Sequence, residues 1–112
     1  MIETDIRTYL VTELKDVPVL FERPKTKTKP CVLMKVIGEG YTDHIPAITI
    51  SFTMEHTSFY NAKTLADQVK GLLLVSTSLS NISKASLGGI SSTADSERGI
   101  YSYELIFNFI HY

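Results

Sequence analysis

The side chains that could do chemistry in this chain are few and far apart. His44, His56, His111 and Cys31 are its only histidines and cysteine. Hydrolysis needs a nucleophile, a base and an orienting group, and a zinc site needs closely spaced ligands. The stretch MEHTSFY around His56 lacks the second histidine of a zinc-binding helix. We therefore expect no enzyme, metal or cofactor, surface or turn positions for the histidines, and a buried, unreactive Cys31.

Clustered charge occurs in the segment KTKTK, which contains Lys25, Lys27 and Lys29. In an extended loop alternate residues project to the same side, so the three ammonium groups would share one side. Two interpretations stay open: a solvated loop kept extended by repulsion, or a contact with phosphate or with an acidic neighbour. Residues 36 to 62 hold three acidic residues and no Lys or Arg. Copies of the chain could thus stack through unlike surfaces.

Length and composition limit the class of protein. A chain of 112 residues with 44% hydrophobic and 21% charged residues is typical of one globular domain. Its net charge of -1 gives no overall attraction to nucleic acid or to a membrane surface. The charged start MIETDIR is unlike a signal peptide, and a lone cysteine favours a reducing compartment. We expect a protein made in the cytoplasm, without a membrane partner.

Hydrophobic periodicity predicts the elements that position these groups. Spacings of three and four predict amphipathic helices over residues 3–15 and 58–74, the second capped by Thr57 or Ser58. Apolar or alternating runs predict strands, and GEGYTDHIP (38–46) is expected to be a turn or mobile loop. The Gly88-Gly89 pair predicts a bulge. The expected strands are 17–21 at an edge, 31–36, 47–55, 84–92 and, after a hairpin loop at 93–99, 100–112.

This order, α-β-β-β-α-β-β, predicts an α+β fold. Hairpin connections favour a single antiparallel or mixed sheet of four to five strands, and the two amphipathic helices should cover one of its faces.

The last strand has two unlike faces. One face should form the core under the helices: Tyr101, Tyr103, Leu105, Phe107 and Phe109. The opposite face mixes polar residues with three isoleucines: Ile100, Ile106 and Ile110. We expect these isoleucines to lie in an interface between subunits, with packing under a loop as the alternative.

The ordered pattern resembles the tail-terminator, or tail-completion, proteins of long-tailed bacteriophages, also called minor capsid or head-tail joining proteins. The likeness covers nearly the whole chain and rests on patterns of apolarity. Its segments are PCVLMKV, the alternating strand and helix ITISFTMEHTSFYNAKTLADQVKGLL, and the closing strand RGIYSYELIFNF.

The resemblance implies one structural domain, residues 1–112, without catalysis or cofactor. Such proteins cap the tail tube as a hexameric ring, end tail polymerisation and present a surface to the head. The implied partners are copies of the chain, the tail tube protein, the head-tail connector proteins and DNA in the channel, and the implied location is the head-tail junction of the virion. The alternatives are another neck component, or a small α+β ligand-binding or regulatory domain, because a fold does not fix function.

Overall fold

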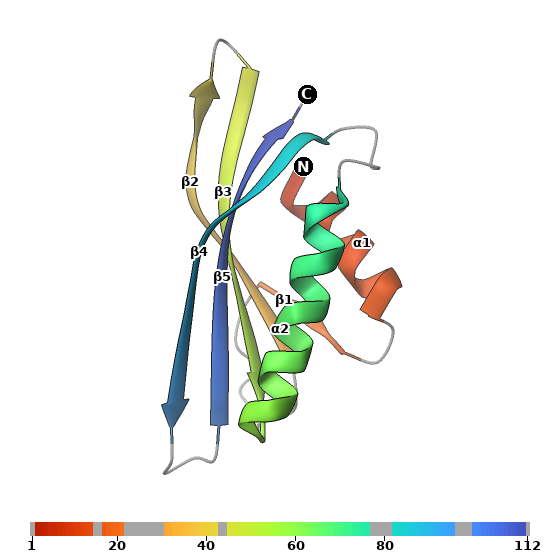
Figure 1. Cartoon of the computed structure of the whole chain (residues 1–112). Coiled ribbons are helices and arrows are strands. Elements are labelled where there is room, and N and C mark those ends of the chain that lie inside the picture. Colours follow the sequence, from red (N-terminus) through yellow and green to blue (C-terminus); the bar gives the residue numbers. More distant parts are fainter. Residues whose placement is uncertain are drawn as a thin grey trace.

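Two helices lie against one face of a five-stranded mixed sheet (Figure 1). The computed structural model describes residues 2–14, 17–21, 31–42, 45–76, 82–95 and 100–111. The order α-β-β-β-α-β-β is as predicted. The elements are α1 (Ile2–Leu14), β1 (Val19–Leu20), β2 (Cys31–Thr42), β3 (Ile45–His56), α2 (Phe59–Leu74), β4 (Ile82–Asp95) and β5 (Ile100–His111).

The strands lie side by side in the order β1-β2-β3-β5-β4. β1 is parallel to β2, and the other neighbouring pairs are antiparallel. The short β1 lies at the edge, as Pro18 predicted, and it pairs only with Val32 and Leu33. The sheet is thus mixed because of this one strand.

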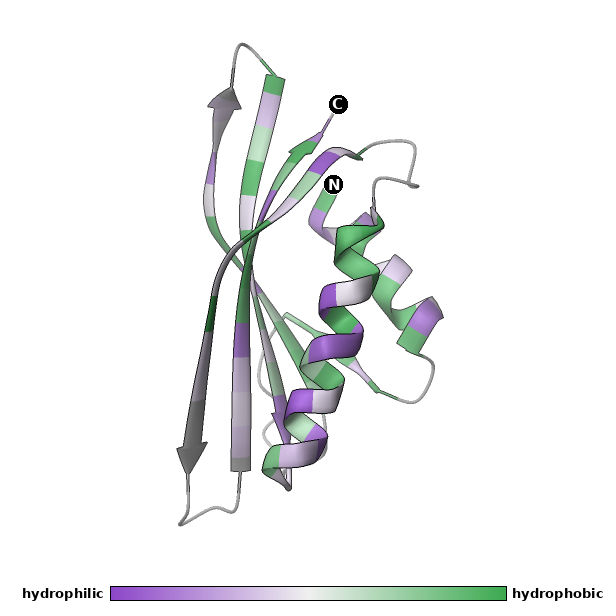
Figure 2. Cartoon of the chain, in the orientation of Figure 1, coloured by the Kyte–Doolittle hydropathy of each residue, from purple (hydrophilic) through white to green (hydrophobic). Residues whose placement is uncertain are grey.

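Local sequence defines the start of α2 and its apolar stripe. Ser58 caps the helix, and its hydroxyl accepts a hydrogen bond from the Asn61 N–H at 3.1 Å. Figure 2 shows hydrophilic and hydrophobic bands alternating along α2. The stripe buries Ala62, Leu65, Ala66, Val69 and Leu73 against the sheet, and α1 buries Ile6, Leu10 and Leu14.

Three phenylalanines fill the space between sheet and helices. Phe52 lies with its ring centroid 6.2 Å from both Phe107 and Phe109, in edge-to-face contacts. All three side chains are fully buried. Leu105, Phe107 and Phe109 confirm three positions of the predicted core face of the last strand, and Tyr103 packs at the margin of the core. Tyr101 is half-buried and lies outside the core, so the prediction for this residue is wrong.

The predicted loop at 38–46 is wrong. β2 continues to Thr42 and β3 begins at Ile45, so the segment forms the two arms of a hairpin. Its pairs Tyr41 with Pro46 and Thr42 with Ile45 lie beyond the last β3–β5 pair, which Ala47 makes with Ile110. Pro46 fits there because no strand among the described residues pairs on its other side. The hairpin therefore projects past the rest of the sheet (Figure 1).

A tyrosine side chain forms a hydrogen bond between the two helices. Tyr9 Oη donates a hydrogen bond of 2.9 Å to the Leu72 carbonyl oxygen. Burial raises the pKa of the Tyr9 phenol, and the Glu13 carboxylate raises that pKa further. On the same helix, Arg7 Nε donates to the Val19 carbonyl oxygen at 2.7 Å and links α1 to β1.

Replacing Tyr9 with Phe should lower the free energy of unfolding by about 1 kcal/mol at pH 7, because the bond to Leu72 is lost. The pKa of Tyr9 is higher in the folded state, so its stabilisation is complete below the unfolded pKa, near 10. That stabilisation is lost as pH rises through the raised folded pKa. Urea unfolding should show the gap between wild type and Tyr9→Phe narrowing above about pH 10. Equal stability at pH 7, or a gap that widens at high pH, would contradict the assignment.

Candidate functional site

The face of the sheet opposite the helices, here called the helix-free face, carries a network of short polar contacts. Thr49 Oγ1 donates to Asn108 Oδ1 at 2.7 Å, joining β3 to β5. Ser51 Oγ donates to Glu104 Oε2, also at 2.7 Å, across the same pair of strands. These bonds satisfy the polar side chains within the subunit and hold them in fixed positions. The face is therefore an ordered surface before any partner arrives.

Of the three isoleucines expected on this face, two have described side chains. Ile106 is half-buried and pairs with Gly89 of β4, while Ile110 is half-buried and pairs with Lys84. Ile100 pairs with Asp95 at the start of β5, and its side chain lies outside the described part. The structure thus places Ile106 and Ile110 on one face, next to edge strand β4. Whether they contact another subunit stays a prediction.

A glycine bulge brings Ile106 close to the sheet edge. The β4–β5 register shifts between Leu87 and Gly89, so the bulge predicted at this glycine pair is confirmed. A methyl group added at Gly89 would meet Ile106 Cδ1 at 4.0 Å, and one at Gly88 would meet Ile106 Cγ2 at 3.8 Å. Ile106 therefore reaches over a strip of β4 that has no side chains.

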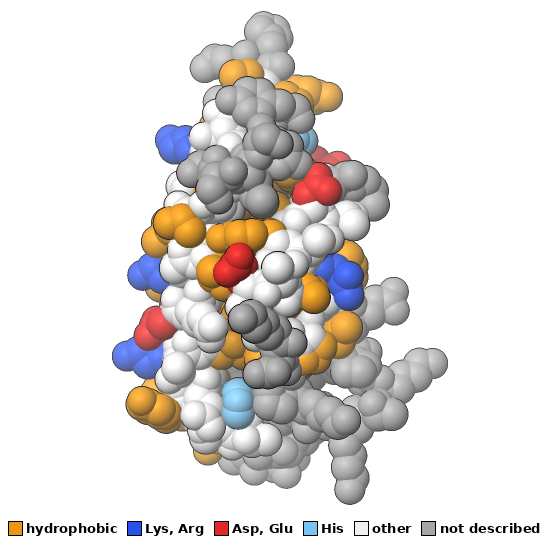
Figure 3. All heavy atoms as spheres, turned by 90° about the vertical axis from the view of Figure 1, so that its right-hand side faces the viewer, with side chains coloured by type: hydrophobic (Ala, Val, Ile, Leu, Met, Phe, Trp, Pro, Cys, Tyr) orange, Lys and Arg blue, Asp and Glu red, His pale blue; other side chains and the backbone are white. Residues whose placement is uncertain are grey.

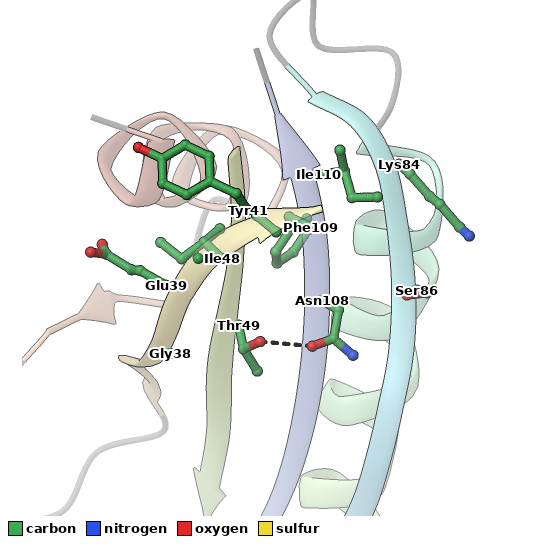
Figure 4. A pocket seen from close by; sticks show the side chains of 12 residues that line it. Gly38, Glu39, Tyr41, Ile48, Thr49, Lys84, Ser86, Asn108, Phe109 and Ile110 are labelled. Atoms are coloured by element: carbon green, nitrogen blue, oxygen red, sulfur yellow. Dashed lines mark hydrogen bonds between the residues drawn. The ribbon is translucent and has the colours of Figure 1, made fainter. Parts of the chain in front are cut away.

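A hollow of about 420 Å³ lies toward the hairpin end of the sheet (Figure 4). Gly38, Thr49, Asn108 and Ile110 are among its lining residues. Glu39 and Lys84 point outward from opposite sides of it, so neither charge converges on its centre. The hollow has a mixed apolar and polar lining that could accept a side chain of a partner, and charged groups do not cluster in it.

The other candidate groups are not brought together. His56 ends β3 beside Tyr101, whereas His111 lies at the other end of β5 and pairs with Ile82. Cys31 is buried, as expected, with its Sγ 3.9 Å from Glu55 Oε1. Within the described ranges no group of three His, Cys, Asp or Glu residues could hold a metal ion. His44 lies outside those ranges.

The two expectations drawn from charged residues concern the lysine segment and the acidic segment 36–62. Lys25, Lys27 and Lys29 lie outside the described residues, so the structure does not test their contact with DNA or a partner ring. Glu55, one of the acidic residues of segment 36–62, is only 4% exposed. It cannot contribute to an acidic outer surface, so that part of the stacking hypothesis is wrong. Figure 3 shows acidic and basic side chains interspersed on the helix side.

Sequence reasoning missed exposed aromatic groups at both ends of the molecule. Tyr41, in the projecting hairpin, is 78% exposed. At the start of α2, Tyr60 is 76% exposed, and Phe59 contacts Tyr101 and Tyr103 with centroid distances of 6.4 and 5.7 Å. The signal was present in the run SFYN, which follows a strand directly and breaks the apolar stripe of the helix. No described helix is long and apolar enough to cross a membrane.

The two bulge glycines allow a matched test of the polar network. A methyl group at Gly88 would lie 2.9 Å from Asn108 Nδ2, so Asn108 must turn and lose its bond to Thr49. At Gly89 the nearest atom is at 4.0 Å, which is ordinary contact. Both Gly→Ala changes restrict the unfolded chain similarly, so Gly88→Ala should be less stable than Gly89→Ala by about 1 kcal/mol in urea unfolding. Equal stability would mean that Asn108 is not held in place.

Comparisons with known proteins identify a solved structure with the same fold. No protein-family model and no curated protein sequence matches the chain. Among solved structures, it is similar to a chain of the structure described as "Virion of native gene transfer agent (GTA) particle". The TM-score is 0.59 at 12% sequence identity, over 91% of this chain and 83% of that chain. The two proteins therefore share one fold over nearly their whole lengths.

Proposed function

We propose that this chain is a structural subunit of a phage-like particle, and specifically a tail terminator. It caps the tail tube as an oligomeric ring, ends tail polymerisation and provides a surface for head attachment. The observation that carries the proposal is the shared fold with a chain of a gene transfer agent virion, which covers 91% of this chain. The sequence pattern independently resembles the tail-terminator family, and no catalytic step is part of the proposal.

A closed ring needs two different surfaces on each subunit, one for each neighbour. The helix-free face supplies candidates for one of them, since Ile106 and Ile110 lie there beside edge strand β4. Resemblance to the family gives six copies as the expected number. Partners along the tail axis are then the tail tube protein on one side and head-tail connector proteins on the other.

Lys25, Lys27 and Lys29 have a place in this proposal. A ring at the head-tail junction surrounds the path of the DNA, and three closely spaced ammonium groups attract phosphates without reading sequence. We assign these lysines to contact with DNA in the channel or with the adjoining ring.

The position in the particle distinguishes a terminator from another neck component. Without a terminator the tail tube keeps growing, so particles lacking this chain should have tails longer than normal and of varied length. Loss of a connector leaves tails of normal length and heads that are not joined. Electron microscopy of particles from a strain without the gene measures tail length directly. Tails of normal, uniform length would overturn the terminator assignment and favour a neck component.

Substitutions at two adjacent residues of β5 test folding and assembly separately. Phe107 is fully buried under the helices, so Phe107→Glu places an unpaired charge in the core and should abolish folding. Ile106 points to the helix-free face, so Ile106→Glu should leave a folded, soluble subunit that fails to form the ring or to stop tail growth. Circular dichroism measures the first property, and tail length in complemented particles measures the second. If Ile106→Glu unfolds the subunit as severely as Phe107→Glu, that face is part of the core and not an interface.

A further inference from the structure

Both edges of the sheet are open in the part of the chain that the structure describes. β4 forms one edge along its whole length. At the other edge, β1 covers only Val32 and Leu33 of β2, so residues 34–42 have no described strand beside them. Unpaired edge strands present rows of N–H and C=O groups that can accept another strand.

Most of the β4 edge lacks the charges and prolines that commonly block pairing; Lys84 lies at its start, and the strand has register shifts next to Lys84 and Gly89. From Ala85 to Ala94 it has no charged residue and no proline, which are the common devices that block an edge. Ile90 is 54% exposed on this strand, and Ile37 is 49% exposed on the open part of β2. Each edge thus combines free backbone groups with one exposed aliphatic side chain.

Strand direction makes the two edges compatible in a ring. β2, β3, β5 and β4 alternate in direction, so β4 runs opposite to β2. A ring axis that runs along the strands preserves direction from one copy to the next. The β4 of one copy and the β2 of the next are then antiparallel neighbours, as in the rest of the sheet.

The register across the sheet gives the height of this contact. Met34 pairs with Phe52, Phe52 with Leu105, and Leu105 with Ile90. These four paired residues form one row across the sheet. In the same way, the row that begins at Gly40 on β2 ends at Lys84 on β4. The open part of β2, residues 34–42, therefore begins in the row of Ile90 and extends from there toward the start of β4. On the other side of that row, β1 pairs with β2 and blocks a further strand.

Bulges on the two edges fall at the same height. In β2 the register shifts between Val36 and Gly38. In β4 it shifts at the matching height, between Leu87 and Gly89, and again near the start of the strand, between Ile82 and Lys84. Val36 and Leu87 belong to a single row, which passes through Ile50 and Phe107. Because an extra residue bends a strand, both edges bend next to this row. A neighbouring β2 can consequently follow the curve of β4.

We propose that adjacent copies in the ring join by antiparallel pairing of the first half of β4 with residues 34–42 of β2 in the next copy. Ile106, which reaches over the Gly88-Gly89 strip, then packs against the next copy's β2 on the helix-free side. Lys35 of that copy lies at the level of Ile106 and Gly89. This inference rests on the proposed ring and specifies how it is built.

Cysteine cross-linking in assembled particles tests the pairing. Lys35 and Ser91 are exposed on the helix-free side of β2 and β4, two rows apart in register. Particles carrying Lys35→Cys with Ser91→Cys, treated with a short bismaleimide, should give a ladder of covalent oligomers on a denaturing gel. A second pair, Lys35→Cys with Ser86→Cys, should still cross-link if the register between the two copies is shifted. It replaces the first pair if that variant does not fold. Cys31 stays in place, because it is 3% exposed.

Matched controls are the single variants and Lys35→Cys with Asp67→Cys, which places the second thiol on the outward side of α2. The edge pairs should form at least ten times more cross-linked dimer than the controls. If electron microscopy shows a ring of this chain but both edge pairs cross-link no more than the controls, edge pairing is overturned and the terminator ring stands. If particles contain no ring of this chain, both proposals are overturned.

Discussion

The layer of phenylalanine rings between sheet and helices is the interaction on which the rest of the structure depends. Phe52, Phe107 and Phe109 contact one another at centroid distances of 5.9 to 6.2 Å and are covered by α1 and α2. Burying each ring contributes on the order of 2 to 3 kcal/mol. Both helices pack on this one side. On the opposite side Cys31, Ser51 and Glu55 are also buried, whereas Ile106, Asn108 and Ile110 stay at least partly exposed. The one-sided core thereby creates the surface that assembly can use.

Periodicity was sufficient to predict the elements that bury a stripe or a face. Both helices, the alternating β3 and the inward face of β5 follow from the spacing of apolar residues, since side chains repeat at fixed intervals in each type of structure. The parallel pairing of β1 and the hairpin through residues 38–46 were not predicted in this way. Glycine and proline in GEGYTDHIP favour a loop locally, but beyond the reach of β5 the cross-strand pairing of β2 with β3 outweighs that preference.

Candidate surfaces were harder to predict than the core. Alternation alone placed Ile106 and Ile110 on the helix-free face, because strand geometry fixes which side a residue takes. The burial of Glu55 depends on tertiary contacts, so counting acidic residues along segment 36–62 misjudged its surface charge. Open edges are likewise a property of the strand order β1-β2-β3-β5-β4, which no local pattern in the sequence specifies.

A polymer such as a tail tube stops growing when its last layer is covered by a subunit that the next layer cannot join. We propose that this chain forms such a layer, on the basis of its shared fold and its open edges. Cryo-electron microscopy of intact particles tests this account most directly. It predicts one closed ring of this chain, with six copies, between the end of the tail tube and the head. Density for the chain at another place in the particle, or its absence from mature particles, would contradict the account.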